Sequence, residues 1–358
     1  MVLFMVLGAA DRILGNRFGL GEKFEEGVMA MGSLALAMIG IICLAPVLSE
    51  VLRPVVVPVY QFLGADPAMF AGTILANDMG GASLAQELSL TDEAGQFGGL
   101  IVGAMLGPTV VFTIPVGLGI IRPEDRTALA RGVLCGVVTI PLGSLAGGLA
   151  AGFPVVMVLR NLIPIVLIAL LIALGLWRIP RGMVRGFQVF GRIVVIVITA
   201  GLAIAILQKL TPLTLLPGMT PIEEGFAIVG DIAIVLAGAF PLVFVITRVF
   251  RTPLMKLGRL MGMNDVAAAG LVATLANNIP MFGMMKDMDE RGKVINVAFA
   301  VSAAFVFGDH LGFTAGFDAE MIFPMIVGKL VGGVTAVAVA MFLTRREKTE
   351  VQHGSDGH

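Results

Sequence analysis

Long apolar stretches separated by short charged segments run along almost the whole chain. A stretch of about 20 apolar residues is long enough for a helix to cross the hydrocarbon core of a membrane, which is about 30 Å thick. The first stretch is too short to cross alone, so we expect either an incomplete helix or a truncated start. We predict nine spans, near residues 1–14, 27–48, 97–120, 131–152, 155–177, 187–209, 225–247, 294–316 and 320–343.

Two further apolar stretches contain polar residues, glycine and proline in their middle. Residues 68–87 read MFAGTILANDMGGASLAQEL, and residues 266–285 read VAAAGLVATLANNIPMFGMM. Glycine and proline interrupt the hydrogen-bond ladder of a helix. Irregular backbone is tolerated at membrane depth only where it is buried in protein or lines a cavity. Both stretches are therefore predicted to be broken or re-entrant helical elements.

The placement of charge predicts the orientation of the chain. Loops 88–96 and 315–320 are acidic and contain no Lys or Arg. By the positive-inside rule the basic segments are cytoplasmic and the acidic loops are external. This assignment requires the element at 68–87 to enter and leave from outside, and the element at 266–285 to enter and leave from inside. The basic segments are 12–23, 122–131, 178–192, 248–259 and the C-terminal tail.

Three short motifs recur in the same order about half a chain apart. Because the first copy starts inside and the second starts outside, the recurrence predicts an inverted repeat, the plan of many secondary transporters. The matching pairs are EEG at 25–27 and 223–225, LANDM at 75–79 and LANNI at 275–279, and GSLAGG at 143–148 and GKLVGG at 328–333.

These patterns predict an all-α polytopic membrane protein. It has about nine to eleven transmembrane helices, an inverted-topology repeat and two broken or re-entrant elements. The predicted parts are a first repeat at 1–152, a linker helix at 153–186, a second repeat at 187–344 and a polar cytoplasmic tail at 345–358.

The composition agrees with a membrane protein and excludes other classes. Of the residues, 57% are hydrophobic and 14% are charged, whereas soluble domains have about 45–50% and about 25%. An outer-membrane barrel would show short alternating segments instead. The net charge is −1, so the charge does not indicate binding to nucleic acid. Asp11 and Arg12 directly follow the first stretch, which lacks a basic leader, so no signal peptide is expected. Cys43 and Cys135 are predicted to be buried thiols.

Few polar side chains lie within the apolar stretches, and such residues commonly mark solute pathways. Asp309 and His310 stand in the string FGDHLGF, and the carboxylate beside His310 makes it a candidate for proton coupling. Structural alternatives remain: the asparagines could bond each other between the repeats, His310 could cap a helix, and Glu26 could be a helix-start residue favoured by the macrodipole. The substrate-binding candidates are Asn77, Asp78, Asn277, Asn278, Asp309 and Glu26.

The motifs of the common enzyme classes are missing from the sequence. It contains no GxSxG, no HExxH, no P-loop and no metal-spaced Cys/His cluster. We therefore expect no enzyme activity, no cofactor and no metal. The sequence has one Trp and one Tyr against 22 Phe. An aromatic cage for a quaternary ammonium usually needs Trp and Tyr, so a small primary ammonium or a neutral polar solute fits better.

Several strings resemble the ethanolamine utilization transporter family, EutH. They include FEEGVMAMG (24–32), DMGG (78–81), ATLANNIPMFGMMKDMDERGKVIN (273–296) and GDHLGF (308–313). The resemblance spans roughly residues 20–345. It implies an inner-membrane protein that imports ethanolamine, which ethanolamine ammonia-lyase then consumes within a catabolic microcompartment. It also suggests that Asp78 or Asp309 faces the ammonium while asparagine amides take the hydroxyl.

We therefore predict a transporter that works by alternating access at a site between the repeats. A channel-like pore for small polar amines or neutral solutes is the alternative, because inverted repeats with broken elements also build channels. A membrane scaffold without transport is a third reading. The expected partners are ethanolamine and membrane lipid, and a homodimer is expected because many transporters with re-entrant elements pair through one half.

Overall fold

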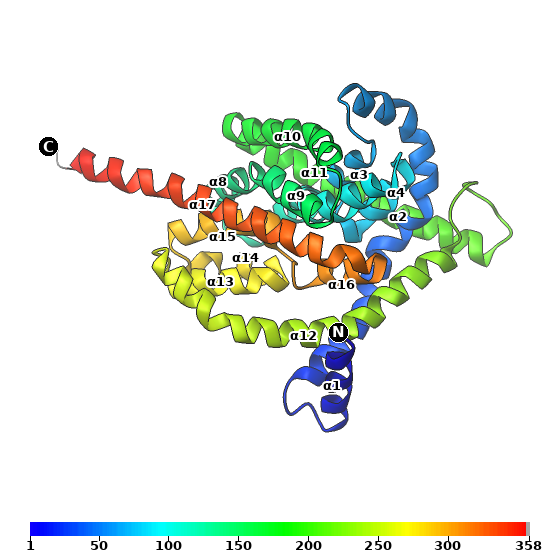
Figure 1. The fold of residues 1–358 in the computed structure, drawn as a ribbon, viewed down its shortest axis with the longest axis horizontal. Helices are drawn as coiled ribbons and strands as arrows, with labels where there is room; N and C mark the ends of the chain where they lie inside the picture. The colour runs from blue at the N-terminus through cyan, green and yellow to red at the C-terminus, as the bar shows by residue number, and fades with distance from the viewer. Residues whose placement is uncertain (356–358) are drawn as a thin grey trace.

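The computed structural model describes residues 1–355, apart from the side chains of Phe250 and of residues 345–355, and every regular element in this part is helical (Figure 1). The predicted polar tail at 345–358 therefore lies outside the described side chains. The α-helices are α1 (Val2–Ile13), α2 (Leu20–Phe62), α3 (Ala68–Ile74), α4 (Gly81–Leu88), α5 (Asp92–Gln96), α6 (Leu106–Pro108), α7 (Ile114–Ile120), α8 (Arg126–Val137), α9 (Ile140–Ala150), α10 (Val155–Arg178), α11 (Pro180–Leu210), α12 (Ile222–Leu260), α13 (Asp265–Ala276), α14 (Asn278–Met284), α15 (Glu290–Ala303), α16 (Asp309–Phe317) and α17 (Ile322–Ser355). Short 3-10 or π turns are η1 (Asn77–Met79), η2 (Phe97–Ile101), η3 (Val102–Ala104), η4 (Thr109–Thr113), η5 (Pro123–Asp125), η6 (Met285–Asp287) and η7 (Ala319–Met321).

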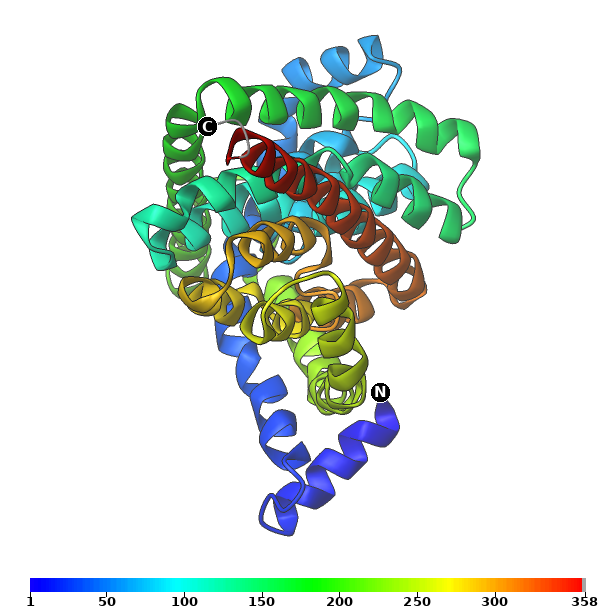
Figure 2. The same cartoon turned by 90° about the vertical axis from the view of Figure 1, so that its left-hand side faces the viewer.

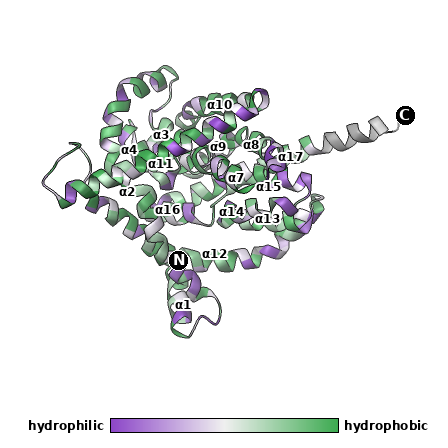
Figure 3. Cartoon of the chain, turned by 180° about the vertical axis from the view of Figure 1, so that it is seen from behind, coloured by the Kyte–Doolittle hydropathy of each residue, from purple (hydrophilic) through white to green (hydrophobic). Residues whose placement is uncertain are grey.

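Seven helical segments in the described part are long and apolar enough to cross a membrane. They match seven of the nine predicted spans. The other two differ for local reasons: α1 has 12 residues, and the predicted span at 294–316 is interrupted between Ala303 and Asp309. Hydrophobic residues predominate along the long helices (Figure 3), which suits a multi-pass membrane protein.

The two longest helices pack along one another and organise the molecule. α2 contacts α12 over much of its length, and α1 projects from the bundle together with the start of α2 (Figures 1 and 2). The contact is close because both helices carry glycine in the EEG motif. A Cβ at Gly27 would lie 2.4 Å from the Leu236 oxygen, and one at Gly225 would lie 3.0 Å from Ile39 Cγ2. Small residues let membrane helices approach closely.

A second pair of helices meets through the other glycine-rich motif. α9 packs on α17, and a Cβ at Gly143 would lie 2.6 Å from the Gly328 oxygen, while one at Gly328 would lie 3.0 Å from the Gly143 oxygen. The Thr139 hydroxyl donates a hydrogen bond to the Gly332 oxygen across the same contact, at 3.1 Å. Residues that match in sequence thus contact each other reciprocally, as in an interface with two-fold symmetry.

Both stretches predicted to be broken are interrupted in the structure. Between α3 and η1, Leu75 and Ala76 are extended, and Gly80 then takes a left-handed φ of 83°. Between α13 and α14, Asn277 is extended, and its side chain accepts a hydrogen bond from the Ile279 amide. The freed backbone groups of these interruptions are available to other partners.

A third interruption, which the sequence analysis did not predict, lies at residues 304–308 between α15 and α16. The Phe305 amide donates to the Thr274 oxygen at 3.2 Å, and the Phe307 amide donates to the Leu275 oxygen at 2.9 Å. The interrupted end of α13 is therefore satisfied by the interrupted segment after α15. Phe305 has a φ of +64°, an uncommon conformation for a bulky residue that is held by its surroundings.

Glycine residues pack directly against the interrupted segments. A Cβ at Gly107 would lie 1.9 Å from the Leu75 oxygen, and a Cβ at Gly308 would lie 2.0 Å from the Ala276 oxygen. No larger residue fits at either position without a shift of backbone. η1, which follows the first interruption, and α16, which follows the third, also contact each other.

Candidate functional site

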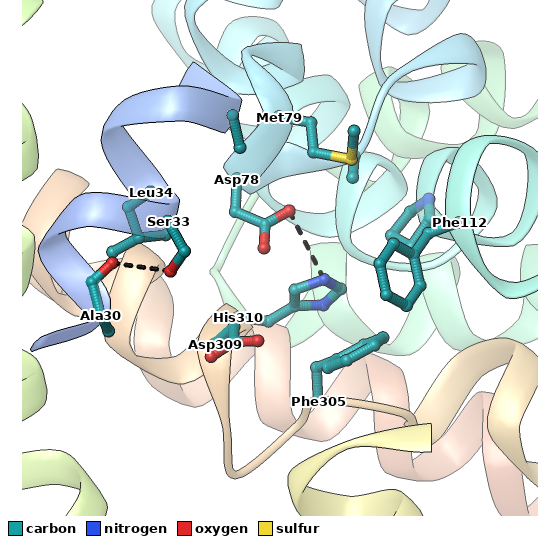
Figure 4. A pocket seen from close by; sticks show the side chains of 12 residues that line it. Ala30, Ser33, Leu34, Asp78, Met79, Phe112, Phe305, Asp309 and His310 are labelled. Carbon is teal, nitrogen blue, oxygen red and sulfur yellow. Dashed lines mark hydrogen bonds and ion pairs between the residues drawn. The ribbon is translucent and has the colours of Figure 1, made fainter. Parts of the chain in front are cut away.

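A cavity of about 230 Å³ lies where η1 and α16 approach α2. Asp78 enters it from η1, while Asp309 and His310 enter from the start of α16 (Figure 4). The aromatic rings of Phe112 and Phe305 form one wall and meet edge to face at 5.5 Å. The remaining lining residues are Ala30, Ser33, Leu34, Ala37, Ala76, Met79 and Pro108.

The helix interruptions position the polar residues of this cavity. Asp78 lies in the 3-10 turn that follows the extended residues of the first interruption. Asp309 and His310 begin α16 immediately after the third. A continuous helix would place consecutive side chains about 100° apart around its axis, so the breaks allow groups from separate segments to share one small space.

Three ionisable side chains form a chain at the edge of the cavity. His310 Nε2 is 3.8 Å from Asp78 Oδ1, which is longer than a hydrogen bond. On the other side of the ring, Lys329 Nζ lies 3.0 Å from His310 Nδ1 and also donates to the Ala104 oxygen. Lys329 is 1% exposed and His310 is 2% exposed. This arrangement links a buried cation to a carboxylate through an imidazole.

The sequence analysis did not single out Lys329. A signal was present, because this lysine is the only charged residue in the apolar run from 321 to 343, and an ionisable residue inside such a run usually has a role. It stands in GKLVGG, where the first copy of the motif has Ser144. The prediction from this motif concerned only the recurrence of its glycines.

A second cavity, of about 310 Å³, adjoins the first through Asp309, which lines both. Glu26 and Asn277 lie on this second cavity. Glu26 pairs with Lys23 and its side chain is 52% exposed. The exposed Lys23–Glu26 pair therefore lies on a cavity that also contains the half-buried carboxylate of Asp309.

Asn77 and Asn278 are not among the residues that line either cavity. Both are fully buried. The Asn278 amide donates to the Thr113 hydroxyl at 3.0 Å, and not to an asparagine of the first broken element. Neither polar atom of the Asn77 side chain has a hydrogen-bond partner in the described part of the chain.

Two further observations concern possible metal ligands and the cysteines of the described residues. Among them there is no cluster of three or more His, Cys, Asp or Glu side chains that could hold a metal ion. Cys43 and Cys135 are buried free thiols, as predicted.

The apolar helices and their interruptions define a multi-pass helical membrane protein with a small, mostly apolar cavity that Asp78, Asp309 and His310 line. The chain belongs to the EutH family, described as ethanolamine utilisation proteins, whose family model matches residues 1–343. The resemblance inferred from the sequence is therefore confirmed.

Named relatives cover nearly the whole chain. It is 68% identical to the probable ethanolamine permease EutH of Listeria monocytogenes serotype 1/2a (strain 10403S), over 97% of this chain and 93% of the relative. It is 53% identical to the probable ethanolamine permease EutH of Escherichia coli (strain K12), over 98% and 97%. It is also 51% identical to the uncharacterized protein YxeR of Bacillus subtilis (strain 168), over 98% and 95%. No solved structure matches the chain.

Proposed function

We propose that this protein is a permease that carries ethanolamine across the cytoplasmic membrane, binding it in the cavity between Asp78 and Asp309. The observation that carries the proposal is that two carboxylates share one small cavity at the meeting of two helix interruptions. A protonated primary amine can donate charge-assisted hydrogen bonds to both. The names of the relatives are those of transporters and not of enzymes, which agrees with the absence of enzyme motifs.

The roles of individual residues follow from their places. Asp78 binds the ammonium, and Asp309, which lines both cavities, receives it on the way to or from the second. His310 is the proton-coupling candidate, since it lies between Asp78 and Lys329. Asn277 and Glu26 line the route through the second cavity. Asn77 and Asn278 lie outside both cavities, so a role for them in substrate binding stays a prediction.

Alternating access between two inverted repeats is the proposed mechanism. It is supported by the contact of α9 with α17, where the matching Gly143 and Gly328 meet each other, and by that of α2 with α12, where Gly27 and Gly225 each pack on the other helix. In this scheme the repeats at 1–152 and 187–344 rock about the cavity, and helix 153–186 links them. The basic segments and the tail face the cytoplasm by the positive-inside rule. The homodimer stays a prediction.

The test is uptake of labelled ethanolamine into proteoliposomes that contain the purified protein. We expect saturable uptake that excess choline does not block, because the quaternary trimethylammonium group of choline has no N–H to donate to the carboxylates. We also expect unlabelled ethanolamine inside the vesicles to drive label inward by counterflow, which a pore cannot do. Uptake no greater than in empty vesicles would refute the substrate assignment. Linear uptake without counterflow would identify the pore instead.

A further inference from the structure

A single lysine is buried at the centre of the molecule, within reach of the proposed substrate site. Lys329 lies on α17, and its ammonium contacts the Ala104 oxygen and His310 Nδ1. A charge buried this deeply is costly unless it is paired. The first copy of the glycine motif has Ser144 at the matching position, so the glycine packing of α17 does not itself require a lysine.

The donors and acceptors define the state of the histidine. A lysine ammonium has donors only, so His310 Nδ1 must accept the hydrogen bond from Lys329. In the neutral ring the proton then resides on Nε2, which faces Asp78 Oδ1 at 3.8 Å. A neutral ring then lies between the Lys329 ammonium and the Asp78 carboxylate, with its Nε2–H on the side of Asp78.

We propose that Lys329 is a built-in counter-cation that allows the empty carrier to change its orientation. This inference rests on the proposed function. Asp78 and Asp309 carry two negative charges, and Lys329 compensates one of them. With a substrate ammonium bound, the cluster is neutral; without it, the cluster keeps one negative charge. Removing Lys329 would leave the empty cluster with two uncompensated carboxylates and the loaded cluster with one.

This difference in charge separates two steps of the transport cycle. Without Lys329, the loaded carrier has the same net charge as the empty wild-type carrier, which reorients in each cycle. The empty variant carries one charge more, and an unpaired buried charge is strongly unfavourable. Net uptake requires the empty carrier to return, whereas exchange of internal for external ethanolamine does not. Loss of Lys329 should therefore impair net uptake far more than exchange.

The experiment compares net uptake with exchange in the same proteoliposomes. The variants are Lys329→Met, and Lys329→Ser, which introduces the residue of the first motif copy; Lys286→Met at an exposed position is the control. We expect the ratio of net uptake to exchange to fall by about tenfold or more in both Lys329 variants and to stay at the wild-type value in the control. Size-exclusion profiles identify any variant that does not fold, and the other then carries the test.

The outcomes distinguish this proposal from the one on which it rests. If wild-type protein takes up no ethanolamine, the proposed function fails. If wild-type protein transports and exchanges normally but a folded Lys329 variant loses both activities in equal proportion, or neither, the counter-cation role is refuted.

A different observation carries a second inference at one end of the bundle. A cavity of about 800 Å³ opens between the start of α8 and the turn from α10 to α11, and no acidic residue is among those that line it. Trp177 and Leu176 give it an apolar side. Its basic residues come from two segments some 50 residues apart in sequence. They are Arg126, Arg131, Arg181 and Arg185.

The position of this cavity suits a lipid. Leu170 and Leu171 on α10 and Ile193 on α11 are exposed apolar residues, so lipid chains can lie along these helices with a headgroup at the arginines. Arginine binds phosphate through two parallel hydrogen bonds, and basic pockets between membrane helices bind anionic headgroups. We propose that this cavity binds the phosphate of an anionic phospholipid.

Thermal unfolding of the full-length protein in detergent tests this site. We expect phosphatidylglycerol, but neither phosphatidylcholine nor soluble glycerol phosphate, to raise the Tm. The double variant Arg181→Gln/Arg185→Gln should lose this shift, whereas Arg160→Gln, at the other end of α10, should keep it. Equal shifts with both lipids, a shift with glycerol phosphate of the same size, or an unchanged shift in the double variant would each overturn the assignment.

Discussion

Replacing Asp78 by asparagine tests the proposed ammonium site with minimal change of shape. The Asp78 carboxylate is 3.8 Å from His310 Nε2, which is too long for a hydrogen bond. Folding therefore does not depend on a bond between these two side chains. In the proposed complex it accepts a charge-assisted hydrogen bond from the substrate. Such a bond contributes about 1.5–3 kcal/mol, and because each 1.4 kcal/mol is a factor of ten, the KM for ethanolamine should rise roughly 10- to 150-fold.

The assay is initial-rate uptake of labelled ethanolamine at concentrations well below the wild-type KM, where the rate falls by the same factor as kcat/KM. Asp287→Asn, at an exposed position, is the matched control and should behave as wild type. The Tm of Asp78→Asn should stay close to the wild-type value, which separates lost binding from lost folding. A folded Asp78→Asn protein with wild-type KM and rate would refute the assignment of the ammonium site.

Two further predictions concern the framework around the site. Gly308→Ala should lower stability by about 1–3 kcal/mol and impair transport, because its Cβ would lie 2.0 Å from the carbonyl oxygen at the end of α13. Gly283→Ala, at a position with open space around it, is the control. Equal Tm values for the two variants would contradict this prediction. Asp125→Asn should cost about 3 kcal/mol in thermal unfolding, because it removes the 2.7 Å partner of buried Lys293 and leaves only the exposed carboxylate of Glu290. Burial lowers the pKa of Lys293, but its bonds to Asp125 and Glu290 raise it more, so the net pKa lies above the ordinary 10.5. The ion pair should therefore stabilise fully below that pH and lose its effect as pH rises through the raised pKa; a wild-type Tm for Asp125→Asn at neutral pH would rule the contribution out.

The sequence predicted the two interruptions at 68–87 and 266–285 because Asn, Gly and Pro stand in the middle of otherwise apolar runs. The interruption at 304–308 was missed because its string, AFVFG, has a single glycine and no proline. Its stability comes from elsewhere, since the Phe305 and Phe307 amides bond to the carbonyls of Thr274 and Leu275. Contacts between segments some 30 residues apart cannot be read from a local pattern.

The candidate site was predicted in part. Asp78, Asp309 and His310, which were all chosen from the sequence, line one cavity, although Asp309 and His310 were expected in an uninterrupted span and not in a broken element. Lys329 was missed because a prediction of membrane spans from hydropathy tolerates a single lysine within an apolar run. The side chain of Lys329 is buried because α17 packs on α9 and against α16.

The chemistry of the cavity limits which cations it can select. Its charged groups are carboxylates, and its aromatic groups are Phe112 and Phe305, whose faces attract a cation less strongly than Trp would. A primary ammonium gains hydrogen bonds to Asp78 and Asp309 that a trimethylammonium cannot form. Burying a trimethylammonium would leave both carboxylates with unfilled acceptor sites, and unsatisfied buried charges are costly. We therefore expect discrimination against choline to follow from the missing N–H donors.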